Sequence, residues 1–223
     1  MILTTFGDMV RVPGSSRRGT GERKAVSLAQ AKAEGADVRV VYSPLDALQI
    51  ARDNPSRPVI FLGVGFETTA PMVGSALLKA KVERVENFYV FSTHKLTPPA
   101  TRAILDAGEV ALDGIIGPGH VTTVIGAEAW RFLPAEYGVP VAVAGFEPLD
   151  LLRAILALVT MAEDDTPEVD NTYARSVSAE GNVIAQQAMD LAFEVADAEW
   201  RGFGLIPRSG LRLREMYADF DAA

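Results

Sequence analysis

VGFETTAP, Val64–Pro71, follows the apolar run Val59–Leu62 and leads into the predicted helix of MVGSALLKA. Eighty positions after Gly65 the same three residues return in VAGFEPLD, Val143–Asp150, again behind an apolar run. Each copy therefore puts Gly-Phe-Glu where a predicted strand ends and a predicted helix begins. Strands that alternate with helices are typical of α/β folds, so this segment and its repeat indicate the fold class.

Short runs rich in Val and Ile predict six strands, at Ile2–Phe6, Val38–Tyr42, Val59–Gly63, Phe88–Ser92, Gly114–Ile116 and Val141–Ala144. Several have successive apolar residues, as strands buried on both faces do, which favours parallel sheets covered by helices. We expect an α/β fold of two small parallel-sheet lobes with helices on both faces, plus a helical C-terminal extension. The lobes would cover residues 1–95 and 96–165, and the extension 166–223, because an acidic segment near residue 165 breaks the pattern.

Helix signals stand between the predicted strands. Ser43 followed by Pro44 is a typical N-cap with a proline at the first helical position. A helix that starts at Pro148 is apolar over most of its surface, which predicts a buried position between domains. Residues 172–200 predict one long helix, and the Gly and Pro spacing that follows predicts loops and then a short helix.

The chain has 223 residues and a net charge of −8, so it lacks the basic excess that binding to nucleic-acid phosphates requires. One basic cluster, at residues 17–24 in a Gly- and Ser-rich stretch, predicts a solvated loop. No apolar run reaches the roughly 20 residues of a membrane span, and the first residues lack the features of a signal peptide. We therefore expect a cytoplasmic protein that binds neither nucleic acid nor membrane.

There are no cysteines and only two histidines, His94 and His120. The chain therefore has no thiolates for disulfides, iron–sulfur clusters or cysteine-ligated metal sites. A zinc site of the histidine-rich kind would need both histidines together with carboxylates. We accordingly expect no metal ligands within this chain.

Four predicted loops follow strands and carry polar or flexible residues. They are the two Gly-Phe-Glu loops, Ser92–Ala100 with His94, and the Gly-Pro-Gly-His loop at Gly117–Gly126. In open α/β sheets ligands bind outside the carboxyl ends of the strands, so these loops are expected to surround one cleft. Glu67, His120 and Glu147 are the candidates for catalysis, because carboxylates and imidazoles exchange protons. The other candidate residues of the cleft are Gly65, Phe66, Thr68, Thr69, His94, Gly117, Pro118, Gly119, Gly145 and Phe146.

A purely structural interpretation stays open for each loop. A glutamate in the first turn of a helix is favoured by the positive end of the helix dipole, so Glu67 and Glu147 could serve the helices alone. His120 could equally cap a turn. The shared position of the four loops at strand ends is the stronger argument for a site.

Several longer motifs occur along the sequence. They are TFGDMVRVPGS, GADVRVVYSPLDALQIA, GVGFETTAP, GPGHVTTVIG, AGFEPLDLL and DAEWRGFGLIPRSGLRLR. In these motifs and in their order the sequence resembles the HypD family of hydrogenase maturation proteins, and the resemblance runs from Met1 to about Ala223.

The resemblance implies a scaffold on which the Fe(CN)2CO centre of nickel–iron hydrogenases is assembled. It further implies two partners, a HypC-type small chaperone that holds the iron and a HypE-type protein that delivers cyanide, and a 4Fe-4S cluster. By motif, it places the two Gly-Phe-Glu loops, His94 and the Gly-Pro-Gly-His loop along the cleft near the iron. It also implies a metal-binding α/β scaffold protein rather than a stand-alone enzyme.

The sequence departs from the family in one respect, because the cysteine-containing segments of the family are missing. The resemblance therefore suggests a central fragment of the family chain, to which no iron or cluster should bind tightly. Two alternatives stay open. One is an α/β domain that binds a small phosphate or carboxylate compound without any maturation role. The other is an interaction fragment that docks the small chaperone through its exposed surface.

Overall fold

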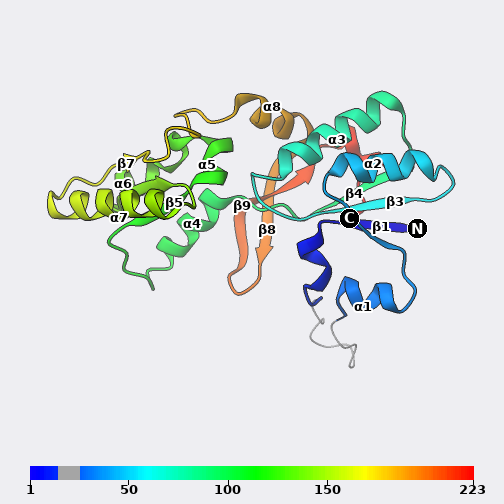
Figure 1. Ribbon diagram of the computed structural model, residues 1–223, viewed down its shortest axis with the longest axis horizontal. Coiled ribbons are helices and arrows are strands. Elements are labelled where there is room, and N and C mark those ends of the chain that lie inside the picture. Colours follow the sequence, from blue (N-terminus) through cyan, green and yellow to red (C-terminus); the bar gives the residue numbers. More distant parts are fainter. Residues whose placement is uncertain (15–25) are drawn as a thin grey trace.

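The computed structural model describes residues 1–14 and 26–223, and the basic cluster expected at residues 17–24 lies outside them. Figure 1 shows two sheets at opposite ends of the molecule with a β-hairpin between them. The strands are β1 (Ile2–Thr5), β2 (Val38–Val40), β3 (Val59–Gly63), β4 (Phe88–Ser92), β5 (Ile115–Pro118), β6 (Val141–Ala144), β7 (Val169–Asp170), β8 (Phe193–Trp200) and β9 (Gly204–Leu213).

The α-helices are α1 (Leu28–Ala33), α2 (Pro44–Asp53), α3 (Ala70–Glu83), α4 (Thr97–Asp106), α5 (Gly119–Ile125), α6 (Phe132–Tyr137), α7 (Pro148–Glu163) and α8 (Val183–Ala192). Three 3-10 helices complete the described elements: η1 (Gly7–Arg11), η2 (Ala127–Trp130) and η3 (Glu215–Phe220). The expected cap of α2 is confirmed, because the Ser43 side chain accepts from the Leu45 N–H in a capping box with Asp46.

The first sheet has the order β2-β1-β3-β4, and all its strands are parallel. The register aligns Ile2, Val59 and Phe88 across the sheet, so these buried side chains point to one face. Helices α2 and α3 pack on that face, and α1 lies on the other side, as Figure 1 shows. This arrangement confirms a parallel α/β lobe with helices on both faces.

The second sheet has the order β5-β6-β7, again with parallel strands. Strand β6 is buried along its whole length, because helices cover both of its faces. On one face Val141 packs with Trp130 and Leu133, and on the other Ala142 packs with Ala154 of α7. The unbroken apolar run Val141–Ala144 therefore predicted correctly that β6 is a strand buried on both faces.

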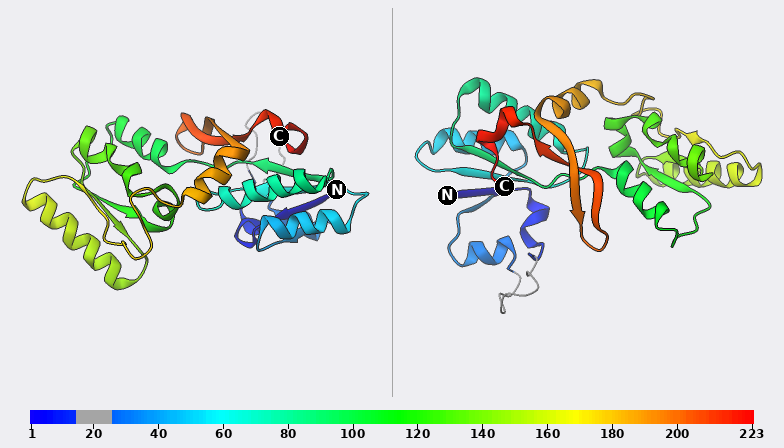
Figure 2. Two further views of the ribbon diagram at one scale, coloured as in Figure 1. Left: turned by 90° about the horizontal axis from the view of Figure 1, so that it is seen from above. Right: turned by 180° about the vertical axis from the view of Figure 1, so that it is seen from behind.

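The helical C-terminal extension is the main correction. Of the long helix expected at residues 172–200, only α8 forms, and the chain continues as the antiparallel hairpin β8–β9. Phe193, Leu211 and Tyr217 of this segment are buried in the core of the first lobe, so burial decides their conformation. Figure 2 shows the hairpin between the two sheets from above and from behind. The lobe boundaries near residues 95 and 165 stay predictions.

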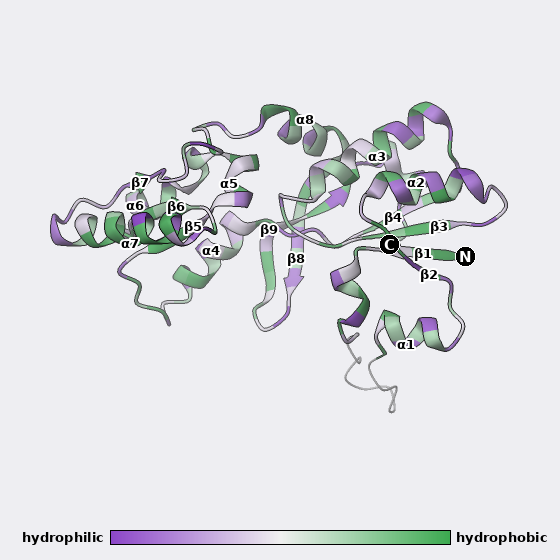
Figure 3. Cartoon of the chain, in the orientation of Figure 1, coloured by the Kyte–Doolittle hydropathy of each residue, from purple (hydrophilic) through white to green (hydrophobic). Residues whose placement is uncertain are grey.

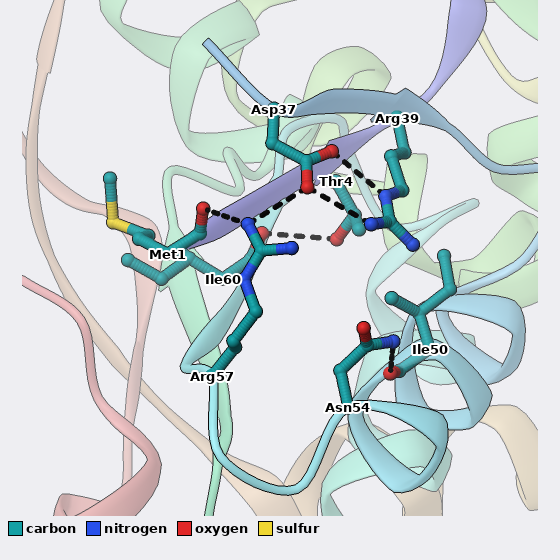
Figure 4. A network of polar contacts seen from close by, with 8 residues as sticks. All are labelled: Met1, Thr4, Asp37, Arg39, Ile50, Asn54, Arg57 and Ile60. Carbon is teal, nitrogen blue, oxygen red and sulfur yellow. Dashed lines mark hydrogen bonds and ion pairs between the residues drawn. The ribbon is translucent and has the colours of Figure 1, made fainter.

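Helix α7 is the second correction, because it is not buried between domains. One side packs on β6 through Ala154, while Leu152 and Leu156 are 64% and 66% exposed. Figure 3 shows the helix apolar along most of its length. Its apolar surface therefore faces outward, where no other element of the described chain covers it.

Candidate functional site

The first Gly-Phe-Glu loop joins β3 to α3. Gly65 has a φ of +145°, and a Cβ there would lie 2.1 Å from the Thr69 hydroxyl, so only glycine fits. The Gly65 carbonyl accepts from the Lys95 N–H, which ties the loop to the end of β4. Phe66 and Thr68 are exposed, and the Phe66 ring lies 6.2 Å from that of Trp200 on the hairpin.

Glu67 is only 1% exposed and points to the start of α4. Its carboxylate accepts from the Thr97 N–H at 2.7 Å and from the Thr97 hydroxyl at 3.1 Å. The glutamate therefore satisfies a free N–H at a helix N-terminus. Burial raises the pKa of Glu67, while the hydrogen bonds from Thr97 act against this rise.

The second Gly-Phe-Glu loop joins β6 to α7 and differs from the first at its glutamate. Glu147 stands at the N-cap of α7 with an exposed side chain, and it pairs with Arg175 at 2.9 Å. Arg175 also binds Asp150 through both of its terminal nitrogens. The Arg175 hydrogen bonds, followed by one with Glu147, lower the pKa of Asp150 to about 2.

Gly145 has no room for a side chain, because a Cβ would lie 2.2 Å from an Asp150 oxygen and 2.6 Å from the Tyr173 ring. The guanidinium of Arg175 stacks 4.4 Å from the centre of that same ring. Arg175 and Tyr173 thus fix the loop that presents Phe146 and Glu147. Neither residue is predicted by the sequence pattern, because both contact the loop from 25 or more positions away and no local spacing marks them.

The Gly-Pro-Gly-His loop lies next to the second Gly-Phe-Glu loop. A Cβ on Gly119 would lie 2.2 Å from the Ala144 carbonyl oxygen, so α5 begins in direct contact with the end of β6. This close approach brings the exposed His120 ring to 4.6 Å from the Phe146 ring, edge to face. His120, Phe146 and Glu147 consequently share the carboxyl edge of the second sheet, with Gly117 and Pro118 in β5 behind them.

His94 is buried at the carboxyl edge of the first sheet. The Ser92 hydroxyl donates its hydrogen to the Leu211 carbonyl, so it accepts from Nδ1 of His94 at 3.1 Å. This assigns the neutral Nδ1–H tautomer and leaves Nε2 as a buried acceptor without a partner among the described residues. Burial lowers the pKa of His94 to about 4.

The candidate residues therefore fall into two groups. Glu67 and His94 form the buried group at the first sheet, where Thr97 and Ser92 hydrogen-bond to them. His120, Phe146 and Glu147 form an exposed group at the second sheet with Arg175. The segment after β4 links the lobes, and backbone hydrogen bonds with β9 hold it in place.

Within residues 1–14 and 26–223, no three His, Cys, Asp or Glu side chains lie close enough together to hold a metal ion. None of the helices in the same part of the chain is long and apolar enough to cross a membrane.

The comparisons with known proteins agree on one family. The model of the HypD family, described as "Hydrogenase formation hypA family", matches residues 1–223. The hydrogenase maturation factor HypD of Azotobacter vinelandii is 48% identical over 228 residues, covering 100% of this chain and 58% of that protein. The factor of the same name from Escherichia coli K12 is 46% identical over 223 residues, covering 100% of this chain and 57% of that protein.

The chain spans 57–58% of the length of these two relatives. Its match to the family nevertheless covers every residue, and the motif loops at the sheet edges are part of that match. The chain therefore belongs to the HypD family, whose members include hydrogenase maturation factors.

Proposed function

We propose that this chain forms the α/β body of a scaffold on which the Fe(CN)2CO centre of nickel–iron hydrogenases is assembled. The observation that carries the proposal is the family match over the whole chain, with relatives named as hydrogenase maturation factors. The iron is cargo in this proposal. His120 and Phe146 would face it, because both side chains are exposed and their rings touch at the carboxyl edge of the second sheet.

Each residue of this edge has a role in the proposal that follows from its chemistry. His120 would hold or move a proton beside the cargo, since an exposed imidazole can both accept and donate a proton. Glu147, fixed by Arg175, would order the loop, and the Phe146 ring would restrict water. Glu67 and His94 are buried, so they would act by holding the loops of the first lobe rather than by touching the iron.

The soft ligands of the cargo would come from outside this sequence. Thiolates are strong ligands for low-valent iron, and this chain has no cysteine. A HypC-type chaperone, a HypE-type cyanide donor and a 4Fe-4S cluster belong to the same proposal, with the cytoplasm as the site of assembly. All of them rest on the resemblance to the family.

The proposal is tested in the full-length Escherichia coli relative, in a strain that lacks its own copy. Alanine at the position aligned with His120 should lower hydrogenase activity at least about tenfold, as loss of a positioned acid–base group does. Alanine at the position aligned with Phe146 should also lower it, because the ring that restricts water is lost. The control is alanine at the position aligned with Tyr42, which is 94% exposed in the first lobe. Unchanged activity in both test variants, with normal protein levels, would remove these residues from the proposed site.

Iron binding to the isolated chain is a second test. After anaerobic loading with ferrous iron and desalting, metal analysis should find no stoichiometric iron, because the described residues offer no group of ligands. One tightly held iron per chain would show that the ligands lie within this sequence.

A small-molecule binding domain is the second candidate. It is favoured by a cavity of about 350 Å³ beside α5, lined among others by Thr123, Arg175 and Ser176. Hydroxyls and a guanidinium are typical partners of phosphate and carboxylate groups. Thermal-shift measurements with phosphate and carbamoyl phosphate test it, and any shift should disappear in Thr123→Val.

A further inference from the structure

An open groove runs beside α7 on the second sheet. Helix α7 packs over β5 and β6, and within the described residues it makes little contact with the edge strand β7. The space left next to α7 is a cavity of about 560 Å³. One wall is the flank of α7 with Leu156, Thr160 and Met161, and the other includes Glu168 and Asp170.

The apolar part of the groove continues onto the exposed surface of α7. Leu149, Leu152, Leu156 and Val159 are 58%, 64%, 66% and 48% exposed, respectively. Their spacing of three, four and three residues is the a/d spacing by which one helix packs lengthwise against another. An apolar stripe of this length on the surface of a protein marks an interaction site, because isolated exposed leucines do not align in this way.

The floor and one end of the groove are acidic. Glu168 directly precedes β7 and Asp170 is its last residue, and both line the groove, as does Asp164 where α7 ends. The nine ion pairs found within residues 1–14 and 26–223 include none of these three carboxylates. The C-terminal end of the α7 dipole adds negative potential at the same end. One arginine, Arg153, lines the opposite part of the groove.

We propose that this groove docks an amphipathic helix of a partner protein, with basic residues on one flank of its apolar stripe. The apolar stripe would pack against Leu152, Leu156 and Val159, as in other helix-in-groove complexes. Its lysines or arginines would face Asp164, Glu168 and Asp170. Charge complementarity decides the choice of occupant. A second copy of this chain would bring another acidic groove and a net charge of −8 to the same contact.

A selection from random 16-residue peptides on phage tests the proposal with the whole chain as bait. Enriched sequences should carry apolar residues at i, i+3 or i+4, and i+7, with Lys or Arg on one flank. Labelled versions of these peptides are then titrated with the chain by fluorescence anisotropy. Their Kd should rise at least about tenfold for Leu156→Gln and for the double variant Glu168→Gln and Asp170→Asn, and it should rise with salt.

Two matched variants serve as controls. Val82→Gln removes an apolar side chain that is 83% exposed on α3, and Glu180→Gln removes an exposed carboxylate outside the groove. Both should leave the Kd unchanged. All test positions except Asp170 are exposed, so the variants should fold, and circular dichroism checks this.

Three results would overturn the proposal. One is a selection that enriches no sequence family, and another is enriched peptides without basic residues. The third is self-association, measured by light scattering, that Leu156→Gln abolishes, because the occupant would then be a second copy of the chain.

Discussion

Glu67 accepts two hydrogen bonds from Thr97, one from its backbone N–H and one from its hydroxyl, and so closes the N-terminus of α4. The two residues are 30 positions apart: Glu67 belongs to the loop after β3, and Thr97 is the first residue of α4. This contact fixes where α4 leaves the first lobe on its way to the second.

Replacement of Glu67 by alanine should therefore destabilise the fold. The change leaves a buried N–H and a hydroxyl without their acceptor, which costs about 2 kcal/mol of unfolding free energy. The second copy of the motif supplies the control, since Glu147→Ala removes an exposed ion pair and should cost less than about 1 kcal/mol. Urea unfolding at neutral pH compares the two. Equal losses would mean that the two glutamates have the same role after all.

The neutral His94 should make stability depend on pH. In the unfolded chain the imidazole binds a proton at its ordinary pKa of 6.5, whereas in the folded protein burial lowers the pKa to about 4. The stabilisation is fully present above pH 6.5 and is lost as the pH falls from 6.5 towards 4, by up to about 3 kcal/mol.

Urea unfolding of wild type and His94→Asn at several values in this pH range measures the effect. The difference in unfolding free energy between wild type and His94→Asn should shrink as the pH falls. Val82→Asn is the control, because this side chain is 83% exposed and neither residue titrates, so its unfolding free energy relative to wild type should stay constant. A parallel decline in the wild type and in His94→Asn would show that another group carries the pH dependence.

The ionisation of Glu67 makes stability depend on pH in the direction opposite to that of His94. Its folded pKa is raised by burial, so its contribution to stability is fully present below the ordinary value of 4.5 and is lost as the pH rises through the raised value. Glu67→Gln removes this dependence and keeps an acceptor for Thr97. Its stability relative to wild type should therefore improve between pH 4.5 and neutrality, and a flat difference would contradict the raised pKa.

Local patterns predicted the parts of the fold that local physics decides. Strand β3 begins and ends at the predicted residues, and its alternate side chains Val59 and Phe61 are buried in the core of the first lobe. The helix expected at residues 172–200 includes residues 193–200, yet Phe193 is buried in the core of the first lobe and the chain forms strand β8 there. Gly202 and Gly204, both with positive φ, mark the turn that follows, and they were the available signal for a hairpin.

The positions of the two Gly-Phe-Glu loops were predictable, but their surroundings were not. Strand ends placed both Gly-Phe-Glu loops at the carboxyl edges of the sheets, as the motif suggested. The difference between Glu67 and Glu147 depends on Thr97 and Arg175, which lie 30 and 28 residues away in the sequence. Contacts at such distances leave no trace in the local pattern, so a repeated tripeptide acquired two different environments.

Gly119 should not tolerate a side chain. A Cβ at this position would lie 2.2 Å from the Ala144 carbonyl oxygen, and backbone atoms of two adjoining elements cannot move apart without loss of packing. Gly119→Ala should therefore cost about 1–3 kcal/mol and shift His120 away from Phe146. Gly7→Ala is the control, because its Cβ would meet the nearest atom at an ordinary 3.4 Å. Thermal unfolding gives the stability, and an unaffected melting temperature in Gly119→Ala would contradict the close contact.

Helix α7 should accept polar residues on its outer side. Leu152 and Leu156 are 64% and 66% exposed, so Leu152→Gln and Leu156→Gln should each change the unfolding free energy by less than about 0.5 kcal/mol. Ala154, on the side that packs against β6, is fully buried, and Ala154→Gln should destabilise the protein by several times that amount. Urea unfolding of the three variants decides the matter. A large loss in the leucine variants would mean that the apolar side of α7 is covered in solution by another part of the chain or by a second copy.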